Sequence, residues 1–312
     1  MHAADPWLAL VRAIHFAAVI ALLGQLAYLF LVARGRERPP HFLPLAAWCT
    51  GIAAASALVW LGLEARGMSG LPLEEALAPD TLRTVATQTL FGRIWCVRMG
   101  LLVAIVAALV LLRDGDRGPA ALVAFALAAA AVAALAGMGH AAGGRGLDKV
   151  VRLAADALHL LAAGVWLGAL LPLALCLRQS SRRADPAAFA VAADATRRFS
   201  VLGMACVGAI VLTGIVNTTY TVHGLAAFYE TRYGVLLAAK ISLFFLIAVI
   251  AAINRYVLAP RLAAQSREDV AVALRALQRN AVAELVAGIA ILAIVGLIGI
   301  SMPPSAPMSH PV

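Results

Sequence analysis

Four residues with metal-binding side chains flank one glycine-rich turn near the middle of the chain. Met138 and His140 end one long apolar run, and Asp156 and His159 begin the next. Because residues three apart share a helix face, Asp156 and His159 are expected side by side. A thioether, two imidazoles and a carboxylate at one edge of a bilayer are typical of a metal entrance. A polar corner at the lipid headgroups would use the same residue types.

The types of donor atom favour copper among the common metals. Thioether with imidazole suits Cu(I), and imidazole with carboxylate suits Cu(II), whereas Mg²⁺ and Ca²⁺ require oxygen ligands. Zinc is compatible with the imidazoles but leaves the methionines without a role. The candidate metal ligands are His159, His15, His140, Met138, Asp156, Met302 and His223, with Met308 and His310 as capture residues in the C-terminal tail.

The sequence carries no motif of hydrolytic or phosphate chemistry. It lacks a Gly-rich P-loop, a G-x-S-x-G elbow and an H-E-x-x-H pair. The protein is therefore not expected to be an enzyme.

Long apolar runs predict an all-α integral membrane protein with eight transmembrane helices. Hydrophobic residues make up 63% of the chain and charged residues 13%, whereas soluble domains are about 45–50% apolar. A helix needs about 20 apolar residues to cross a bilayer. Runs of this length cover residues 7–33, 43–63, 90–112, 120–138, 153–177, 199–222, 233–258 and 281–301.

The basic residues are sorted by loop, and this predicts the topology. Odd-numbered loops carry fifteen Lys and Arg residues, and even-numbered loops carry six. The positive-inside rule therefore places the odd loops in the cytoplasm and both termini outside. Because the net charge of +9 is spread over these loops, anionic lipid is an expected partner and nucleic acid is not.

The loops themselves contain helix-start signals. Residues 82–89 are expected to form a short helix capped by Asp80 on the outer surface. Pro186 and Ser266 are expected to start short interfacial helices within the cytoplasmic loops 178–198 and 259–280.

An internal duplication relates the two halves of the chain. Residues 14–18 match residues 158–162, an offset of 144, and residues 91–98 match residues 233–240, an offset of 142. Four helices per half is an even number, so the halves are expected to form parallel pseudo-repeats about an axis normal to the membrane.

The domains predicted from this repeat are a first four-helix half at residues 1–140, a second at 141–301 and a mobile tail at 302–312.

Each half contributes one histidine from inside its first helix and one cation from its third. Histidine within a membrane helix is costly unless it is paired, hydrogen-bonded or bound to metal. We therefore expect His15 and His159 to approach each other near the pseudo-axis, although a hydrogen bond to a neighbouring helix would equally accommodate each ring. Polar or aromatic residues expected to line a pathway or to stabilise the structure are Asn217, Lys240, Arg98 and Trp166.

Landmarks in order along the chain resemble the copper resistance protein D (CopD/PcoD) family of bacterial inner-membrane proteins. They are Phe91-Gly92-Arg93-Ile94-Trp95, the run from His159 to Gly168, Arg198-Phe199-Ser200, Leu212-Thr213-Gly214 with Asn217, Tyr233-Gly234 with Lys240, Asn254-Arg255 with Pro260, and Met302-Pro303-Pro304. The resemblance covers most of the chain.

This resemblance implies copper transport across the inner membrane, usually uptake, with both termini then in the periplasm. It also implies that a separate periplasmic copper-binding protein of the CopC type delivers the ion. Two alternatives remain open at this point. One is a haem b-binding electron carrier, which would pair His15 with His159, and the other is a copper holder or assembly factor that does not transport.

Overall fold

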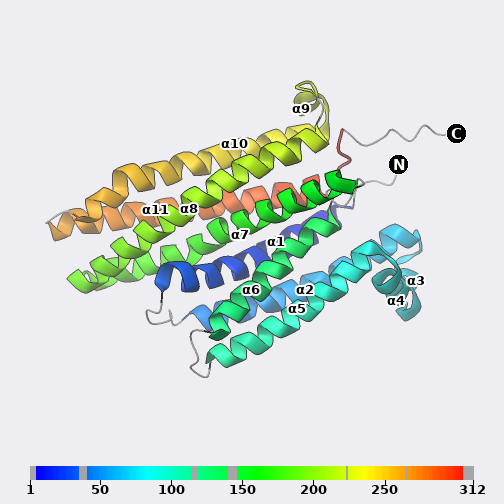
Figure 1. Ribbon diagram of the computed structural model, residues 1–312, viewed down its shortest axis with the longest axis horizontal. Coiled ribbons are helices and arrows are strands. Elements are labelled where there is room, and N and C mark those ends of the chain that lie inside the picture. Colours follow the sequence, from blue (N-terminus) through cyan, green and yellow to red (C-terminus); the bar gives the residue numbers. More distant parts are fainter. Residues whose placement is uncertain are drawn as a thin grey trace.

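The computed structural model describes residues 5–34, 41–113, 119–139, 146–222, 224–263 and 266–304. Over these residues the chain forms helices and connecting turns, without any strand. Eight of the described helical segments are long and apolar enough to cross a membrane, which confirms the predicted number. The fold is therefore an all-α membrane bundle (Figure 1).

The described elements follow one another in a simple order. They are α1 (Pro6–Ala27) continued by η1 (Tyr28–Ala33), α2 (Phe42–Ser69), α3 (Leu73–Ala76), α4 (Pro79–Gln88), α5 (Leu90–Arg113), α6 (Pro119–Ala133) continued by η2 (Ala134–Met138), α7 (Gly146–Arg183), α8 (Pro186–Thr221), α9 (Ala227–Glu230), α10 (Arg232–Ile253) continued by η4 (Asn254–Leu258) and η5 (Ala259–Ala263), and α11 (Arg267–Ile298).

Three helices begin earlier than their apolar runs. Helix α7 starts at Gly146, α8 at Pro186 and α11 at Arg267, whereas we predicted starts at 153, 199 and 281. Consequently Asp156 and His159 lie well inside α7 and not at its start. Hydropathy detects only the part of a helix that lies in lipid, and the added turns are charged but rich in helix-forming residues.

The prediction of two separate interfacial helices is also wrong. Pro186 and Ser266 do mark helix starts, with the Asp185 side chain accepting from the Ala188 N–H and Ser266 Oγ accepting from the Asp269 N–H. Each helix then continues without a break into the membrane as α8 or α11.

Helix α4 is close to its prediction, but its cap is different. It covers Pro79–Gln88, with Ala78 at the N-cap position and Asp80 inside the first turn. The fixed φ of a proline at the first helical position explains this start, because it is already suited to a helix. The carboxylate of Asp80 then lies where the helix dipole favours negative charge.

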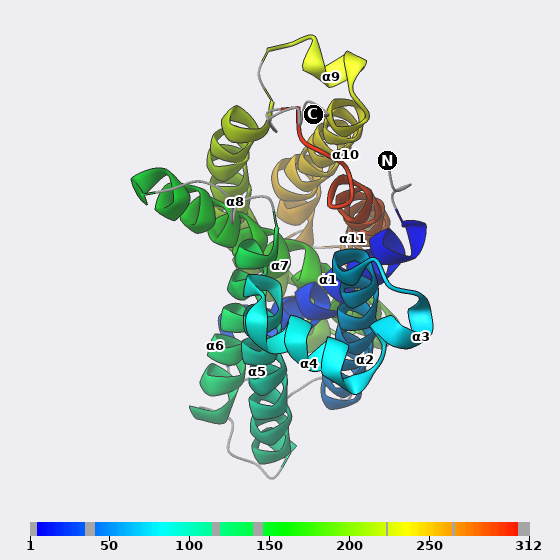
Figure 2. The same ribbon diagram turned by 90° about the vertical axis from the view of Figure 1, so that its right-hand side faces the viewer.

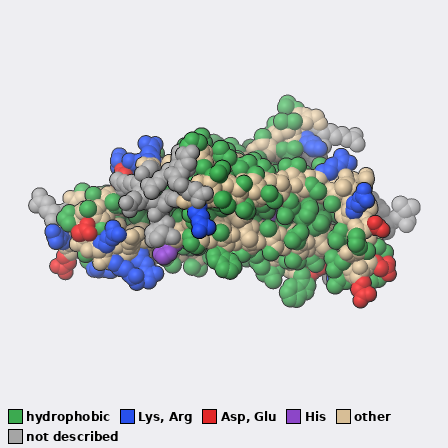
Figure 3. All heavy atoms as spheres, turned by 90° about the horizontal axis from the view of Figure 1, so that it is seen from below, with side chains coloured by type: hydrophobic (Ala, Val, Ile, Leu, Met, Phe, Trp, Pro, Cys, Tyr) green, Lys and Arg blue, Asp and Glu red, His purple; other side chains and the backbone are tan. Residues whose placement is uncertain are grey.

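The bundle has two chemically different ends. Helix α1 begins and α11 finishes at the same end, which we call the terminal end, and α3, α4 and α9 lie there as well (Figure 1). Lysine and arginine side chains gather at the opposite end, which we call the arginine end, and apolar side chains cover much of the surface between the two (Figure 3). This charge asymmetry is the one counted in the loops, and the placement of the termini in the periplasm remains a prediction from it.

Two groups of four membrane helices lie side by side, α1, α2, α5 and α6 in one and α7, α8, α10 and α11 in the other (Figure 2). The first helices of the two groups, α1 and α7, are parallel and in contact. They meet at Gly24 and Gly168, where a Cβ atom on Gly168 would lie 2.1 Å from the Ile20 carbonyl oxygen. Only glycine permits this approach, and the two glycines are 144 residues apart. The domain boundary at residue 140 remains a prediction.

The third helices of the two groups also start alike. Thr89 Oγ1 accepts from the Gly92 N–H at 2.9 Å, and Thr231 Oγ1 accepts from the Gly234 N–H at 3.0 Å. Each hydroxyl donates to a carbonyl four residues earlier, at 2.7 Å in both cases. The same local structure thus recurs 142 residues apart, as the sequence offset predicts.

The two groups differ in how their second and third helices pack. Helix α2 packs against α5, and Trp95 Nε1 donates to the Ala57 carbonyl at 2.8 Å between them. The backbones of helices α8 and α10 do not pack closely against each other, and Leu237 stands at the position equivalent to Trp95. The second group therefore leaves a space between its second and third helices, whereas these helices pack together in the first group.

Candidate functional site

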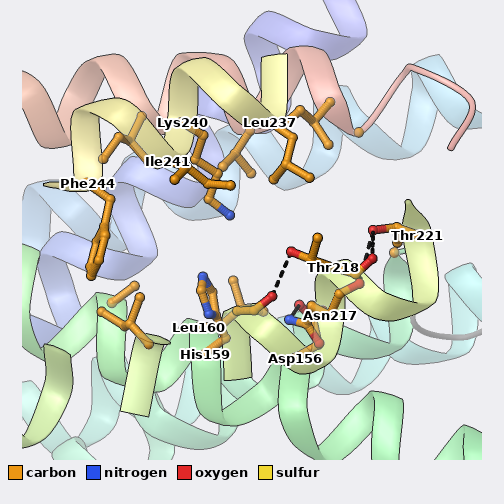
Figure 4. A pocket seen from close by; sticks show the side chains of 18 of the residues that line it. Asp156, His159, Leu160, Asn217, Thr218, Thr221, Leu237, Lys240, Ile241 and Phe244 are labelled. Atoms are coloured by element: carbon orange, nitrogen blue, oxygen red, sulfur yellow. Dashed lines mark hydrogen bonds between the residues drawn. The ribbon is translucent and has the colours of Figure 1, made fainter. Parts of the chain in front are cut away.

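The opening in the second group contains a cavity of about 590 Å³, which we call the main cavity. Its wall is largely apolar, but Asp156 and His159 from α7, Asn217 from α8 and Lys240 from α10 line it. Figure 4 shows these side chains on both sides of the space, with the Lys240 amino group pointing from α10 toward α7. The sequence predicted all four as site or pathway residues, and the fold brings them together.

Hydrogen bonds define the state of the His159 ring. Its Nδ1 lies 3.0 Å from Thr213 Oγ1, and that hydroxyl donates to the Ala209 carbonyl at 2.6 Å. A hydroxyl has a single hydrogen, so Thr213 accepts from the ring and Nδ1 carries the proton. The Nε2 atom of the neutral ring therefore carries a lone pair, and no donor among the described residues is hydrogen-bonded to it. A neutral imidazole oriented in this way by a hydrogen bond is the usual form of a metal-binding histidine.

Asp156 and Lys240 are two of the charged residues that line the cavity, and Arg12 and Arg152 are the others in its described lining. Asn217 Nδ2 donates to Asp156 Oδ1 at 3.3 Å, so the carboxylate is held by a side chain from the neighbouring helix α8. Lys240 acts electrostatically on both Asp156 and His159. The cavity thus offers a carboxylate and an imidazole to a cation, and the same lining contains a lysine that would repel that cation.

Met138 reaches the same cavity from the first group of helices. It lines the cavity, and its sulfur accepts from Arg98 Nη1 at 3.6 Å. Met302 is 78% exposed and is not among the described lining residues. His140, His223, Met308 and His310 lie outside the described residues. Across the residues that are described, no three His, Cys, Asp or Glu side chains gather into a metal-binding group.

The equivalent histidine of the first group has no free nitrogen. His15 is fully buried, its Nε2 lies 2.7 Å from Arg98 Nη2, and its Nδ1 lies 3.0 Å from Ser56 Oγ. Ser56 donates to the Ile52 carbonyl at 2.6 Å, so the ring has the same tautomer as His159. A guanidinium can only donate, and Arg98 therefore occupies the lone pair that His159 keeps free.

The residues around His15 and those around His159, which we call the first and the second constellation, occupy equivalent positions but differ in chemistry. Equivalent pairs, first group then second, are Arg12 and Asp156, His15 and His159, Ser56 and Thr213, Trp60 and Asn217, and Arg98 and Lys240. In the first group Trp60 is fully buried, the Arg12 guanidinium lies 5.1 Å from its ring centre, and His15 meets it edge-on at 5.4 Å. The first constellation is thus packed around an aromatic ring, and although its Arg12 and Trp60 also line the main cavity, only the second places its imidazole in the described lining.

These hydrogen bonds decide whether His15 and His159 can bind one copper ion or one haem between them. A copper ion between the two rings, or a haem with both as axial ligands, would need the Nε2 of His15, which Arg98 holds. The residues present therefore do not fit a bis-histidine haem. Sequence reasoning missed Ser56, although a hydroxyl in the second helix of each half is a signal that could have indicated the pairing.

Trp166 is a wall residue more than a ligand. It is 2% exposed, it contacts Phe244 edge-to-face at 6.1 Å between ring centres, and it lines the inner boundary of the main cavity. It also lines a second cavity nearer the arginine end. It therefore separates the two spaces.

Comparisons with known proteins find the same family in both halves of the chain. A family model described as copper resistance protein D-like, N-terminal domain, matches residues 3–150, and one described as copper resistance protein D matches residues 193–298. The chain is 32% identical to copper resistance protein D of Pseudomonas syringae pv. tomato, over 96% of this chain and 97% of that protein.

Two further relatives are similar over most of this chain. Inner membrane protein YebZ of Escherichia coli (strain K12) is 31% identical over 82% of this chain and 85% of its own length. Copper transport protein CutJ of Bacillus subtilis (strain 168) is 27% identical over 81% of this chain and 47% of its own length. No solved structure matches the chain significantly.

Proposed function

We propose that this chain, which belongs to the copper resistance protein D family, carries copper ions across the bacterial inner membrane. Its eight apolar helices and its relatives make it a multi-pass inner-membrane protein with a role in copper handling. The single observation that carries the proposal is the free Nε2 of His159, which faces a cavity that also holds a carboxylate.

In the proposed site, His159 Nε2 and Asp156 bind the ion, and the Met138 thioether contributes when copper is Cu(I). Asn217 keeps the carboxylate turned toward the cavity. The mixture of imidazole, carboxylate and thioether accepts copper in either oxidation state.

Lys240 keeps this site from holding copper too tightly. A cation bound to His159 and Asp156 is repelled by the ammonium group, and in a site of low dielectric this repulsion is strong. Conduction requires binding that is favourable enough to admit the ion and weak enough to release it. Lys240 thus weakens copper binding at His159 and Asp156 enough for the ion to leave the site.

The ion enters, in this proposal, from the terminal end, which faces the periplasm. A separate periplasmic copper-binding protein of the CopC type delivers it, and His140, His223, Met302 and the tail residues Met308 and His310 receive it on the way to the cavity. The arginine end then faces the cytoplasm, in agreement with the positive-inside rule.

Copper uptake into proteoliposomes tests the proposal, measured with Cu(I) and with Cu(II). We expect His159→Ala to lose uptake while its helix content and elution volume match those of the parent protein. His41→Ala is the matched control, because His41 is exposed and lies next to the start of α2, at the arginine end. Uptake by His159→Ala at the parental rate would refute the site. Copper binding without uptake by the parent protein would indicate a holder and not a transporter.

A further inference from the structure

The second cavity, of about 230 Å³, lies between α7, α8, α10, η4 and α11 on the other side of Trp166. Its apolar wall is interrupted by a small polar group at one side. These polar lining residues are Thr196, Ser200, Asn254, Arg255 and Glu284. The copper site proposed above uses none of them.

Glu284 is the unusual member of this group. It is 1% exposed, and its Oε1 accepts from Asn254 Nδ2 at 2.6 Å. Asn280 Nδ2 donates to Asn254 Oδ1 at 2.8 Å, which fixes the amide so that its NH₂ group faces Glu284. The other carboxyl oxygen, Oε2, has no hydrogen-bond partner among the described residues.

We infer that Glu284 binds and releases a proton during copper transport. An ionised carboxylate inside a membrane is costly without a cation or several donors, and among the described residues a single amide is the only donor to Glu284. Arg255 and Tyr256 are the other titratable groups that line the cavity, and Arg255 Nη1 donates instead to Ser200 Oγ at 2.7 Å. Neither α7 nor α8 contributes a titratable side chain to the described lining.

The ligand is a proton and not copper because of the donor types. The described lining contains no imidazole and no thiol, and Met204 is its one thioether. Oxygen and amide donors are poor ligands for Cu(I). The guanidinium of Arg255 in the same cavity further disfavours a resident metal cation.

Charge balance links this proton to copper in the main cavity. Trp166 lines both cavities, so the two sites lie on opposite sides of one side chain. A copper cation in the main cavity favours the ionised form of Glu284, and by reciprocity an ionised Glu284 favours copper. Copper binding therefore releases the Glu284 proton toward the terminal end, and Glu284 takes up a proton from the arginine end after copper leaves, so net transport exchanges copper for a proton.

The inference rests on the transport proposed above, and its first test does not require transport. Infrared difference spectra between acidic and alkaline buffer are recorded for the full-length parent protein, Glu284→Gln and Glu268→Gln. Glu268 is exposed on the same helix and is the matched control. We expect a protonated-carboxyl band that titrates in the parent and in Glu268→Gln and is absent from Glu284→Gln. The same band in all three proteins would overturn the inference.

The second test uses proteoliposomes loaded with a pH-sensitive dye. We expect an acidic lumen to accelerate copper uptake severalfold for the parent and for Glu268→Gln and to have no effect on Glu284→Gln, although copper still binds to that variant. An equal response of Glu284→Gln to the pH gradient would overturn the inference. If the parent protein moves no copper at all, the transport proposal fails, and the infrared band alone decides the role of Glu284.

Discussion

The contact between Gly24 and Gly168 holds the two groups of helices together and leaves no room for added atoms. A Cβ at position 168 would lie 2.1 Å from the Ile20 carbonyl oxygen and 2.9 Å from the Gly24 Cα. Carbon and oxygen atoms in contact are normally about 3.3 Å apart. Gly168→Ala therefore forces α1 and α7 apart by roughly 1 Å, and overpacking of this kind costs about 1–3 kcal/mol.

Unfolding of the purified protein by increasing amounts of sodium dodecyl sulfate, followed by circular dichroism, measures this cost. Gly208→Ala is the control, because an added Cβ there meets no atom within 4 Å and alanine is favoured over glycine in a helix by about 0.5–1 kcal/mol. The double variant Gly24→Ala with Gly168→Ala should cost less than the sum of the two single changes, since one separation of the helices accommodates both. Equal unfolding midpoints for Gly168→Ala and Gly208→Ala would refute the contact.

Three further predictions concern copper and topology. Asn217→Ala, which frees the carboxylate of Asp156, should weaken copper affinity by about 10–100-fold, measured by competition with a chelator; an unchanged affinity would mean that the carboxylate is not a ligand. Cysteines placed at Gln179 and at Met302, in a background whose native cysteines are serines, should react with an impermeant thiol reagent from opposite sides of the membrane, and labelling from one side would contradict the topology. Met308→Ala and His310→Ala should slow copper uptake only at low copper concentration, because these residues capture the ion and do not hold it in the cavity; loss of uptake at saturating copper would move the site to the tail.

Much of the architecture could be predicted from the sequence because its signals are local. The length of an apolar run decides whether a helix crosses the bilayer, and the offset between the segments around His15 and His159 predicted the parallel repeat. The spacing of Asp156 and His159 placed both side chains on one face of α7. These inferences need only helix geometry, and the structure reproduces them.

The state of each histidine could not be predicted in the same way. His15 and His159 have equivalent positions and similar neighbours in sequence, yet only His159 keeps a free nitrogen. The difference depends on the third helix of each group, which supplies Arg98 in one and Lys240 in the other. Which of these side chains reaches the ring depends on how closely the second and third helices pack, and no local pattern records that distance.

The packing difference has a physical origin in two aromatic residues. Trp95 ties α5 to α2 by its hydrogen bond to the Ala57 carbonyl, and Trp60 fills the space between them with one of the largest buried side chains of the chain. The second group has Leu237 and Asn217 at these positions. Leucine cannot donate a hydrogen bond, and asparagine is too small to fill the space that tryptophan fills.

The two constellations therefore use equivalent positions for different purposes, one structural and one for binding. In the first, a guanidinium and an indole satisfy and bury the imidazole, so the group gains a rigid core against which α7 packs at Gly168. In the second, a flexible ammonium and a small amide leave the imidazole, the carboxylate and the space between α8 and α10 available to an ion. A site that must both bind and release a cation needs that freedom on one side and a fixed wall on the other, and the duplication supplies each from one half of the bundle.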